Sequence, residues 1–424
     1  MHFTTRCLRA VASAAANSGH LPHLDYYSQF RPTAVTMKQY VDFGTTGDQK
    51  QSFKFLRKEM LVRLANIMKE IQLLPPKLLQ MPSARLVQEW YMTSFHDLLK
   101  FEHASASNVE NLQDFSDALR KVLLRHNTVV ETMAEALLEW RDMHGVEIAD
   151  HDNVQYFLDR FYLNRISVRM LMKQHLTLFS SDLPDSPSYV GDIDPDCDVV
   201  RVLTDAFESA QFLCDRYYMM APQLRLTSRN AVNSDPRAPI RCHTVPNHLY
   251  HIAFELFKNS MRATVENVGE EEGPDALPAI DVTVVRGSDD LSIKIADRGG
   301  GVPHNQVYRW FNYMYSTAPR PSNNPGQAPL AGYGYGLPLS RLYARYFNGD
   351  LQITSMQGLG TDALIYLKAR SREAQERVPI YGKRSRERMR LAKRADDYTE
   401  MDTTLIRNLQ PISVNNPVAV YSAK

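Results

Sequence analysis

The residues best suited to chemistry lie on one predicted helix, over residues 246–266. Five polar side chains recur there at spacings that stack them on one stripe of a helix: His251, Glu255, Lys258, Asn259 and Arg262. A charged stripe is usually a solvated face, but Asn and His are poor choices for that purpose alone. An amide oxygen can bind magnesium, a carboxylate can orient or deprotonate a nucleophile, and cations can offset phosphate charge. The stripe therefore indicates magnesium–phosphate chemistry.

Two glycine-rich segments follow this helix. Asp297 and the glycines at 299–301 come directly after a predicted strand over residues 291–296. A carboxylate there can accept a hydrogen bond from an amino group such as that of adenine, and glycines let the backbone approach a flat ring. Residues 332–336 (GYGYG) open a predicted helix, whose free N–H groups can bind phosphates. They match neither a Walker loop nor a dinucleotide fingerprint, and either segment alone could be a simple turn.

A segment without periodicity, residues 318–331, separates Ser316 and Thr317 from the second glycine run. Loops of this length inside a compact domain are usually lids or disordered. Residues 358–361 then turn between two predicted strands and offer Thr361 as a polar contact. The order of these motifs is more specific than any one of them.

The first half of the chain is predicted to be helical. Apolar residues recur at helical spacing over residues 53–74, 83–98, 109–140 and 152–178, with prolines at 75–76 and Gly145 as stops. The third helix is expected to run unbroken to Trp140. Four long amphipathic helices with short connections predict a four-helix bundle, which hides all four apolar stripes at once.

The pattern changes after residues 180–195, a segment rich in Pro, Asp and Ser that marks a domain boundary. Short β-type runs follow over 224–227, 240–244, 280–285, 291–296, 351–354 and 363–367. They alternate with helical segments near 197–220, 246–266, 304–314 and 337–346. We therefore expect an α+β protein of two domains, a helical bundle followed by a mixed sheet covered by helices.

The composition is that of an ordinary globular protein. The 424 residues include 49 basic and 48 acidic side chains, a net charge of +1, and 44% are hydrophobic. These values exclude a disordered, collagen-like or rod-like chain, and the charge balance gives no indication of nucleic-acid binding. No apolar run approaches the ~18 residues of a membrane span. The four cysteines form no C-x-x-C pair and suit a reducing compartment.

The two ends differ from the rest of the chain. Residues 1–24 contain Arg6 and Arg9, many Ser, Thr and Ala, and no acidic residue. This composition is typical of a mitochondrial transit peptide, although a frayed N-terminus is an alternative. Residues 368–394 hold eleven basic and three acidic residues, net +8, and a polar tail follows.

The succession of motifs resembles the GHKL (Bergerat) ATP-binding fold of gyrase, heat-shock chaperones, mismatch-repair ATPases and histidine kinases. The resemblance to pyruvate dehydrogenase kinases is closer and runs from about Tyr26 to about Ala369. It rests on residues 248–264 (HLYHIAFELFKNSMRAT), 314–319 (MYSTAP), 335–347 (YGLPLSRLYARYF), 63–70 (RLANIMKE) and 155–163 (QYFLDRFYL).

The resemblance implies a role for each motif. Asn259 would hold magnesium, Glu255 would act as general base or orienter for an attacking serine, and His251 would support Glu255. Asp297 would bind adenine, assisted by Thr361. The implied ATP-binding residues are Glu255, Leu256, Phe257, Lys258, Asn259, Ser260, Met261, Arg262, Asp297, Ser316, Thr317, Gly332, Tyr333, Gly334, Tyr335, Gly336, Leu337 and Thr361. The implied cofactors are ATP and magnesium, with potassium as a candidate third.

The resemblance also implies the reaction and the partners. The γ-phosphate would pass directly to a serine of the decarboxylase α subunit of the pyruvate dehydrogenase complex, in the mitochondrial matrix. The division would be a transit peptide (1–24), a regulatory bundle that docks the lipoyl domain of the acetyltransferase core (25–180), the kinase domain (196–369) and a basic tail (370–424). A homodimer is expected, with no nucleic acid and no membrane span.

The sequence departs from the family pattern at two places. His126, Arg165 and Arg169 match the family's allosteric pocket for pyruvate or dichloroacetate, but Leu123 stands where an arginine is expected. The tail has Tyr398 where the family has a tryptophan. The alternatives are a branched-chain ketoacid dehydrogenase kinase and a non-catalytic ATP-binding scaffold. A histidine kinase is disfavoured, because His126 is followed by Asn and Thr rather than by an acid.

Overall fold

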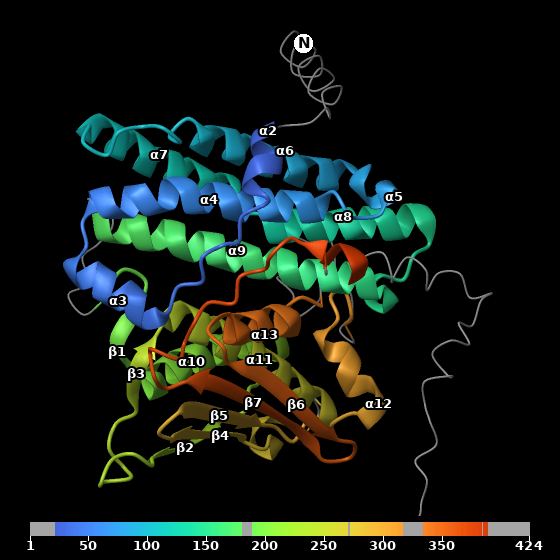
Figure 1. The fold of residues 1–424 in the computed structure, drawn as a ribbon. Coiled ribbons are helices and arrows are strands. Elements are labelled where there is room, and N and C mark those ends of the chain that lie inside the picture. Colours follow the sequence, from blue (N-terminus) through green and yellow to red (C-terminus); the bar gives the residue numbers. More distant parts are fainter. Residues whose placement is uncertain (1–21, 180–188, 270–271, 317–333, 384, 389–424) are drawn as a thin grey trace, which may run out of the picture.

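The computed structural model describes residues 22–179, 189–269, 272–316, 334–383 and 385–388, and it divides into a helical layer and an α/β part (Figure 1). The helical layer consists of α2 (Pro22–Tyr27), α3 (Met37–Thr46), α4 (Gln49–Ile71), α5 (Pro76–Leu79), α6 (Pro82–Leu99), α7 (Val109–Arg125), α8 (Val129–His144), η1 (Ile148–Asp150) and α9 (Asp152–Phe179). No helix in these ranges combines the length and the apolar composition that crossing a membrane requires.

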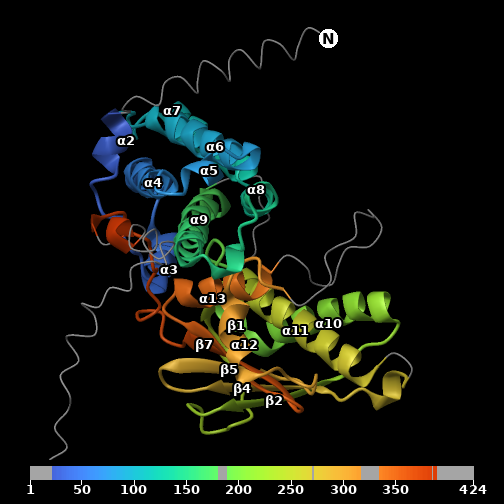
Figure 2. The ribbon, with the colours of Figure 1, turned by 90° about the vertical axis from the view of Figure 1, so that its right-hand side faces the viewer.

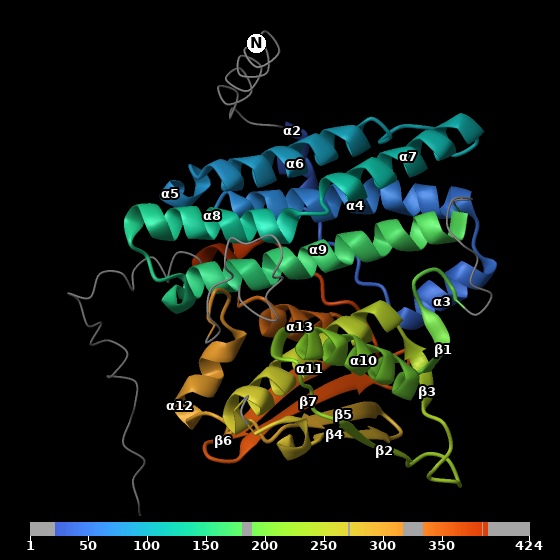
Figure 3. The same cartoon turned by 180° about the vertical axis from the view of Figure 1, so that it is seen from behind.

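Of the four long helices predicted from periodicity, those over 53–74, 83–98 and 152–178 are confirmed as α4, α6 and α9. The prediction for 109–140 is wrong. The predicted continuous helix over 109–140 is two helices, α7 and α8, which Figure 3 shows as separate rods. The backbone leaves the helix at His126 (φ −90°, ψ 11°), and the Arg165 side chain from α9 donates to the carbonyls of His126 and Asn127 at 3.3 and 3.2 Å. Asn and Thr, which favour helix ends over interiors, follow directly.

The α/β part is built on a five-stranded sheet with the order β2-β4-β5-β7-β6, in which only the β2–β4 pair is parallel. Its elements are β1 (Asp194–Asp198), α10 (Val199–Tyr218), β2 (Leu224–Asn230), β3 (Arg241–Thr244), α11 (Pro246–Val268), η2 (Pro274–Ala276), β4 (Ile280–Arg286), β5 (Asp290–Ala296), α12 (His304–Val307), η3 (Tyr308–Phe311), α13 (Gly336–Tyr346), β6 (Asp350–Met356) and β7 (Gly360–Lys368).

One face of the sheet carries the core. Helices α10, α11 and α13 cover that face, and Figure 2 shows the other face without a helix. Strand β5 alternates accordingly, because Leu291, Ile293 and Ile295 are fully buried on the helix side. The prediction of a mixed sheet covered by helices is confirmed, with one correction. The predicted strand at 240–244 lies outside this sheet and pairs instead with β1, a strand that the acidic sequence DPDCD gave no reason to expect.

The two parts are joined by α13, which packs between the sheet and α9, and by the chain after β7, which returns to the helical layer (Figure 1). At the N-terminal end, Leu24 is buried in the helical core, so the last residues of the predicted 1–24 targeting segment belong to the fold. The earlier residues, 1–21, lie outside the described ranges, as do Tyr398 and the rest of residues 389–424.

The returning chain carries Glu376 into a buried ionic network. Arg63, which has no exposed surface, binds Glu376 with Nη2 at 2.7 Å from Oε2 and binds Glu59 with Nε at 2.8 Å from Oε1. The hydroxyls of Tyr40 and Tyr346 also donate to Glu376. The segment predicted to be a basic tail therefore begins inside the core, because Glu376 is buried there. Its carboxylate offsets the high cost of burying the Arg63 guanidinium without a partner.

We expect Glu376→Ala to destabilise the protein by roughly 3–5 kcal/mol, because it removes one of the two carboxylates that pair with the buried Arg63 and leaves its Nη2 end without an ionic partner. The measurement is a urea titration followed by far-UV circular dichroism. Glu373→Ala is the matched control; that side chain is 43% exposed and pairs with the exposed Arg370, so its removal should change the free energy of unfolding by less than about 0.5 kcal/mol. Equal effects of the two substitutions would contradict the importance of the network.

Acid should weaken the helical layer through His175. Burial lowers the pKa of this imidazole from 6.5 to about 4, and its two nitrogens lie 2.7 and 3.1 Å from the hydroxyls of Ser52 and Ser116. Between about pH 6.5 and 4 the unfolded chain binds a proton that the folded chain does not. Lowering the pH through this range therefore decreases the free energy of unfolding by up to about 1.4 kcal/mol per pH unit. His175→Gln should flatten this slope in urea titrations at several pH values, and the exposed His103→Gln should not. An unchanged slope in His175→Gln would refute the assignment.

Candidate nucleotide-binding site

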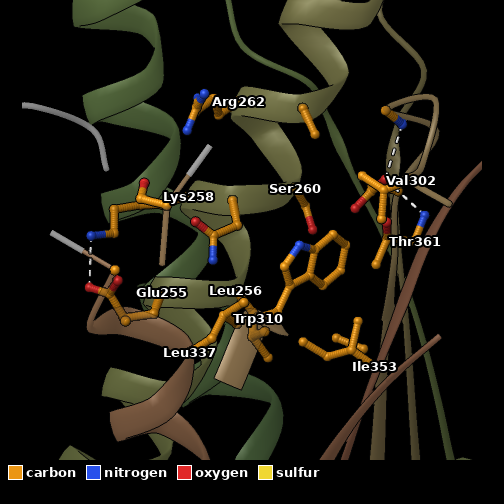
Figure 4. A pocket seen from close by; sticks show the side chains of 18 of the residues that line it. Glu255, Leu256, Lys258, Ser260, Arg262, Val302, Trp310, Leu337, Ile353 and Thr361 are labelled. Atoms are coloured by element: carbon orange, nitrogen blue, oxygen red, sulfur yellow. Dashed lines mark hydrogen bonds and ion pairs between the residues drawn. The ribbon is translucent and has the colours of Figure 1, made fainter. Parts of the chain in front are cut away.

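A cavity of about 530 Å³ opens beside α11. Its walls come from α11, the segment after β5, η3, the start of α13, and strands β6 and β7 (Figure 4). Pockets of roughly 300–1,000 Å³ are typical of small-molecule sites. The cavity collects motifs that lie more than 100 residues apart in the sequence, from His251 to Thr361.

Helix α11 has two faces with different tasks. Pro246 occupies its first turn, and Gly269 ends it with a φ of +92°. All five residues of the predicted polar stripe line the cavity. Phe257 and Met261 do not, which corrects their predicted place in the ATP site: both are fully buried in the core, and the Phe257 ring lies 5.2 Å from that of Phe207. Since each residue turns a helix by about 100°, position 257 faces away from position 255.

The charges on the stripe are arranged in short-range pairs. Lys258 Nζ lies 2.7 Å from Glu255 Oε1 and 4.9 Å from the centre of the Phe254 ring. Arg262 pairs with Glu266 one turn further on, at 2.8 Å. The described part of the chain gives the Asn259 amide no hydrogen-bond partner, which leaves its oxygen available to a cation.

No group of three or more His, Cys, Asp and Glu side chains among the described residues could hold a metal ion without help. A cation at Asn259 would therefore need phosphate oxygens and water to complete its shell. Magnesium commonly accepts this arrangement, because it binds through one or two protein ligands together with substrate phosphates.

Asp297 and Thr361 form the opposite end of the cavity. Asp297 Oδ1 accepts hydrogen bonds from the backbone N–H of Gly299 at 3.0 Å and of Thr361 at 3.1 Å. The carboxyl is 7% exposed, and burial raises its pKa above the ordinary value. Gly360 has no room for a side chain, since a Cβ there would lie 2.0 Å from the carbonyl oxygen of Asp297. Asp297 is thus held as a fixed acceptor at the cavity wall.

The start of α13 closes the cavity beside Glu255. Gly334 has a φ of +68°, and a Cβ on Gly336 would lie 2.3 Å from Glu255 Oε2. Between them, Tyr335 is buried with its ring 5.9 Å from Tyr162 and 5.3 Å from Tyr313. The first turn of α13 therefore packs against both the Glu255 carboxylate and the helical layer.

Most of the other predicted ATP-binding residues also line the cavity: Leu256, Ser260, Ser316, Gly334, Tyr335, Gly336 and Leu337. Thr317, Gly332 and Tyr333 lie outside the described residues. Nucleotide binding by any of these residues stays a prediction.

His251 lines the cavity one turn before Glu255. Burial lowers the pKa of its imidazole, so the ring is held neutral at physiological pH, and its centre lies 4.9 Å from the Tyr343 ring. Its Nε2 is buried and has no hydrogen-bond partner among the described residues. The predicted support of Glu255 by His251 is therefore not present as a direct hydrogen bond.

The cavity also has apolar walls that the sequence analysis missed, formed by Val302, Trp310, Ile353 and Ala363. Val302 directly follows the glycines after Asp297, and the strand alternation of β6 and β7 could have pointed to the other two aliphatic residues. Trp310 carried only a weak signal, as one of several aromatic residues in a short segment.

The predicted allosteric residues also come together, around the break between α7 and α8. Arg165 donates to the His126 carbonyl and Arg169 donates to the Leu123 carbonyl at 3.4 Å. The His126 ring lies 4.5 Å from that of Tyr91, and burial lowers its pKa to about 4. Ligand binding at this cluster stays a prediction.

Comparison with known proteins gives two family models and several relatives. Residues 34–194 match the model described as mitochondrial branched-chain alpha-ketoacid dehydrogenase kinase, and residues 244–371 match the histidine kinase-, DNA gyrase B- and HSP90-like ATPase model. The chain is 57% identical to a mitochondrial pyruvate dehydrogenase (acetyl-transferring) kinase of Ascaris suum, over 94% of this chain and 97% of that protein. It is 58% identical to a probable kinase of the same name from Caenorhabditis elegans, with the same coverage. It is 51% identical to isozyme 3 of Homo sapiens, over 89% of this chain and 92% of that protein.

These similarities extend across both the helical layer and the ATPase part, and the range matched by the ATPase model, residues 244–371, contains the cavity residues. The chain belongs to the mitochondrial pyruvate dehydrogenase kinase family, with a C-terminal part of the GHKL type.

Proposed function

We propose that the protein is an ATP-dependent serine kinase that phosphorylates, and thereby inactivates, the decarboxylase α subunit of the pyruvate dehydrogenase complex in the mitochondrial matrix. One observation carries the proposal: Glu255, Asn259 and Asp297 line a single cavity in a chain more than half identical to such kinases. All three groups are present with the side chains that the chemistry requires.

The residues fit a bound magnesium nucleotide. Asp297 is a fixed acceptor for the amino group of adenine, and the Asn259 amide, which has no hydrogen-bond partner among the described residues, is a ligand for magnesium. Magnesium, when bound, neutralises phosphate charge. Gly334, Tyr335 and Gly336 line the cavity where α13 begins, so the free N–H groups of that helix start can bind phosphates.

Glu255 is the group that would accept the proton of the serine hydroxyl. Its carboxylate lies at the phosphate end of the cavity and is paired with Lys258. A carboxylate here can orient the serine hydroxyl and accept its proton as the phosphoryl group transfers, while Lys258 offsets negative charge. The residues contribute mainly positioning and electrostatic stabilisation.

For the helical layer we infer a four-helix bundle made of α4, α6, α9 and the broken pair α7–α8, which would dock the lipoyl domain of the acetyltransferase core. Tyr26 and Phe30 support the docking role, because their rings are 5.0 Å apart and 53% and 45% exposed. Four further parts of the proposal rest on family resemblance alone. We infer that the protein forms a homodimer and requires potassium, and that it carries a transit peptide within residues 1–24 and a basic tail.

A second candidate substrate is the branched-chain ketoacid dehydrogenase complex. The family model matched by residues 34–194 is described by that activity, although the relatives that match over the whole chain are described by pyruvate dehydrogenase. A non-catalytic scaffold is disfavoured, because Glu255, Asn259 and Asp297 are all retained.

The proposal is tested by phosphate incorporation from labelled Mg-ATP into purified pyruvate dehydrogenase decarboxylase, with the branched-chain decarboxylase in parallel. We expect label on the pyruvate enzyme alone, with stimulation by the lipoyl domain. Glu255→Gln should bind ADP normally and transfer at least about 100-fold less phosphate, because general-base catalysis contributes about 10²–10⁴-fold. Glu208→Gln, which changes an exposed carboxylate on α10, is the matched control. Label on neither decarboxylase, or full activity of Glu255→Gln, would contradict the proposal.

Gly336→Ala tests the contact between α13 and the carboxylate. The new Cβ would lie 2.3 Å from Glu255 Oε2, so we expect the carboxylate or the helix start to shift and kcat to fall about 10-fold or more. Gly382→Ala is the control, because nothing lies within 4 Å of a Cβ at that residue. Thermal denaturation of both variants separates a local from a global effect. Wild-type kcat in a folded Gly336→Ala protein would show that the contact is not needed.

A further inference from the structure

Trp310 is the largest side chain that lines the candidate nucleotide cavity, and none of the roles above uses it. In Figure 4 its indole reaches into the middle of the cavity, between Lys258 on one side and Thr361 on the other. The side of Thr361 holds the fixed Asp297 acceptor, and the side of Lys258 holds Glu255. The indole therefore stands where the base end and the phosphate end of the cavity meet.

Aliphatic side chains lie around part of the indole. Leu256, Leu337 and Ile353 line the same part of the cavity and are drawn around it in Figure 4. Aliphatic side chains can cover a purine ring, but an aromatic ring adds a stacking surface that aliphatic groups lack. Trp310 is the only tryptophan among the residues that line the described cavity.

The short segment that carries Trp310 is tied to the helical layer on both sides of the indole. Arg309 Nη2 lies 2.7 Å from Asp150 Oδ1, and the Asn312 side chain donates to the carbonyl of Ala149 at 2.9 Å. Asp150 and Ala149 belong to η1. Neighbouring contacts therefore restrain the position of the indole before any ligand arrives.

A second set of contacts continues this anchoring along α9. The backbone N–H of Tyr313 donates to Gln155 Oε1 at 2.7 Å, and the Tyr313 hydroxyl donates to Asp159 at 3.1 Å. From the other side, the Arg341 guanidinium of α13 lies 4.4 Å from the centre of the Phe311 ring. A preorganised aromatic ring gives up little conformational freedom when a ligand binds.

We propose that Trp310 is a purine-stacking residue, whose indole packs against the base of the nucleotide while Asp297 accepts a hydrogen bond from the amino group. The inference rests on the proposed function, because it takes the cavity to bind an adenine nucleotide. It adds a residue that determines nucleotide affinity through the base, and it places that residue on a segment held by the helical layer.

The experiment measures the affinity of the full chain for ADP by calorimetry and by intrinsic fluorescence. Aromatic stacking on a base is worth about five- to 150-fold in affinity, so Trp310→Ala should weaken ADP binding by about ten-fold or more. Trp310→Phe keeps a ring and should stay within about three-fold of wild type. Tyr308→Ala is the matched control on the same turn; it is 70% exposed, does not line the cavity and should bind ADP normally.

Intrinsic fluorescence gives a second measurement, which would not respond to ADP if Trp310 had a purely structural role. The chain has three tryptophans, and only Trp310 lines the cavity among the residues described. ADP should therefore change the emission of wild type and of Trp90→Phe, and the change should disappear in Trp310→Phe while ADP still binds. If Trp310→Ala fails to fold, Trp310→Leu supplies the same comparison, with aliphatic cover and no aromatic ring.

Two results would overturn the proposal. One is ADP affinity in a folded Trp310→Ala or Trp310→Leu protein equal to or tighter than that of wild type, as expected for a side chain that blocks the site. The other is an undiminished fluorescence response in Trp310→Phe. If wild-type protein itself binds no ADP, the proposed function fails as well. Wild-type binding with unaffected variants rejects the role of Trp310 alone.

Discussion

The close approach of α13 to Glu255 is the contact on which the candidate site depends. The helix begins at Gly336, directly against the carboxylate, and it ends at Tyr346, whose hydroxyl donates to Glu376. Glu376 in turn binds the buried Arg63. An eleven-residue helix spans about 16 Å, so α13 links a buried ion pair well away from the cavity to the cavity wall beside Glu255.

Each part of the molecule contributes one wall of the site. The sheet holds Asp297 and Thr361 together at the proposed base end, where glycines permit the backbone to come close. Helix α11 supplies the proposed phosphate end from its polar face, and its apolar face anchors it against α10 and the sheet. The helical layer holds η3 and the segment after it. A change in the helical layer can therefore reach the cavity through rigid, directly bonded neighbours.

Local patterns predicted most elements and much of the site, because periodicity and glycine positions report local geometry. The polar stripe of α11 and the aspartate after β5 both line the cavity at the predicted places. The failures have non-local causes. The break after α7 is stabilised by Arg165 from another helix, and Glu376 is buried only because Arg63 lies opposite, 313 residues away in sequence. Phe257 and Met261 lie within the motif on which the family resemblance rests, but helix geometry directs their side chains to the core.

The separation of Arg63 and Glu376 has a consequence for how the chain reaches its native state. A ribosome or an import channel delivers residues in order, so the helices that surround Arg63 emerge long before the carboxylate that neutralises it. Until nearly nine-tenths of the 424 residues have emerged, Glu59 is the only carboxylate of this network that can pair with the guanidinium. Completion of the helical core is thereby deferred until the strands and helices of the ATP-binding part have also emerged.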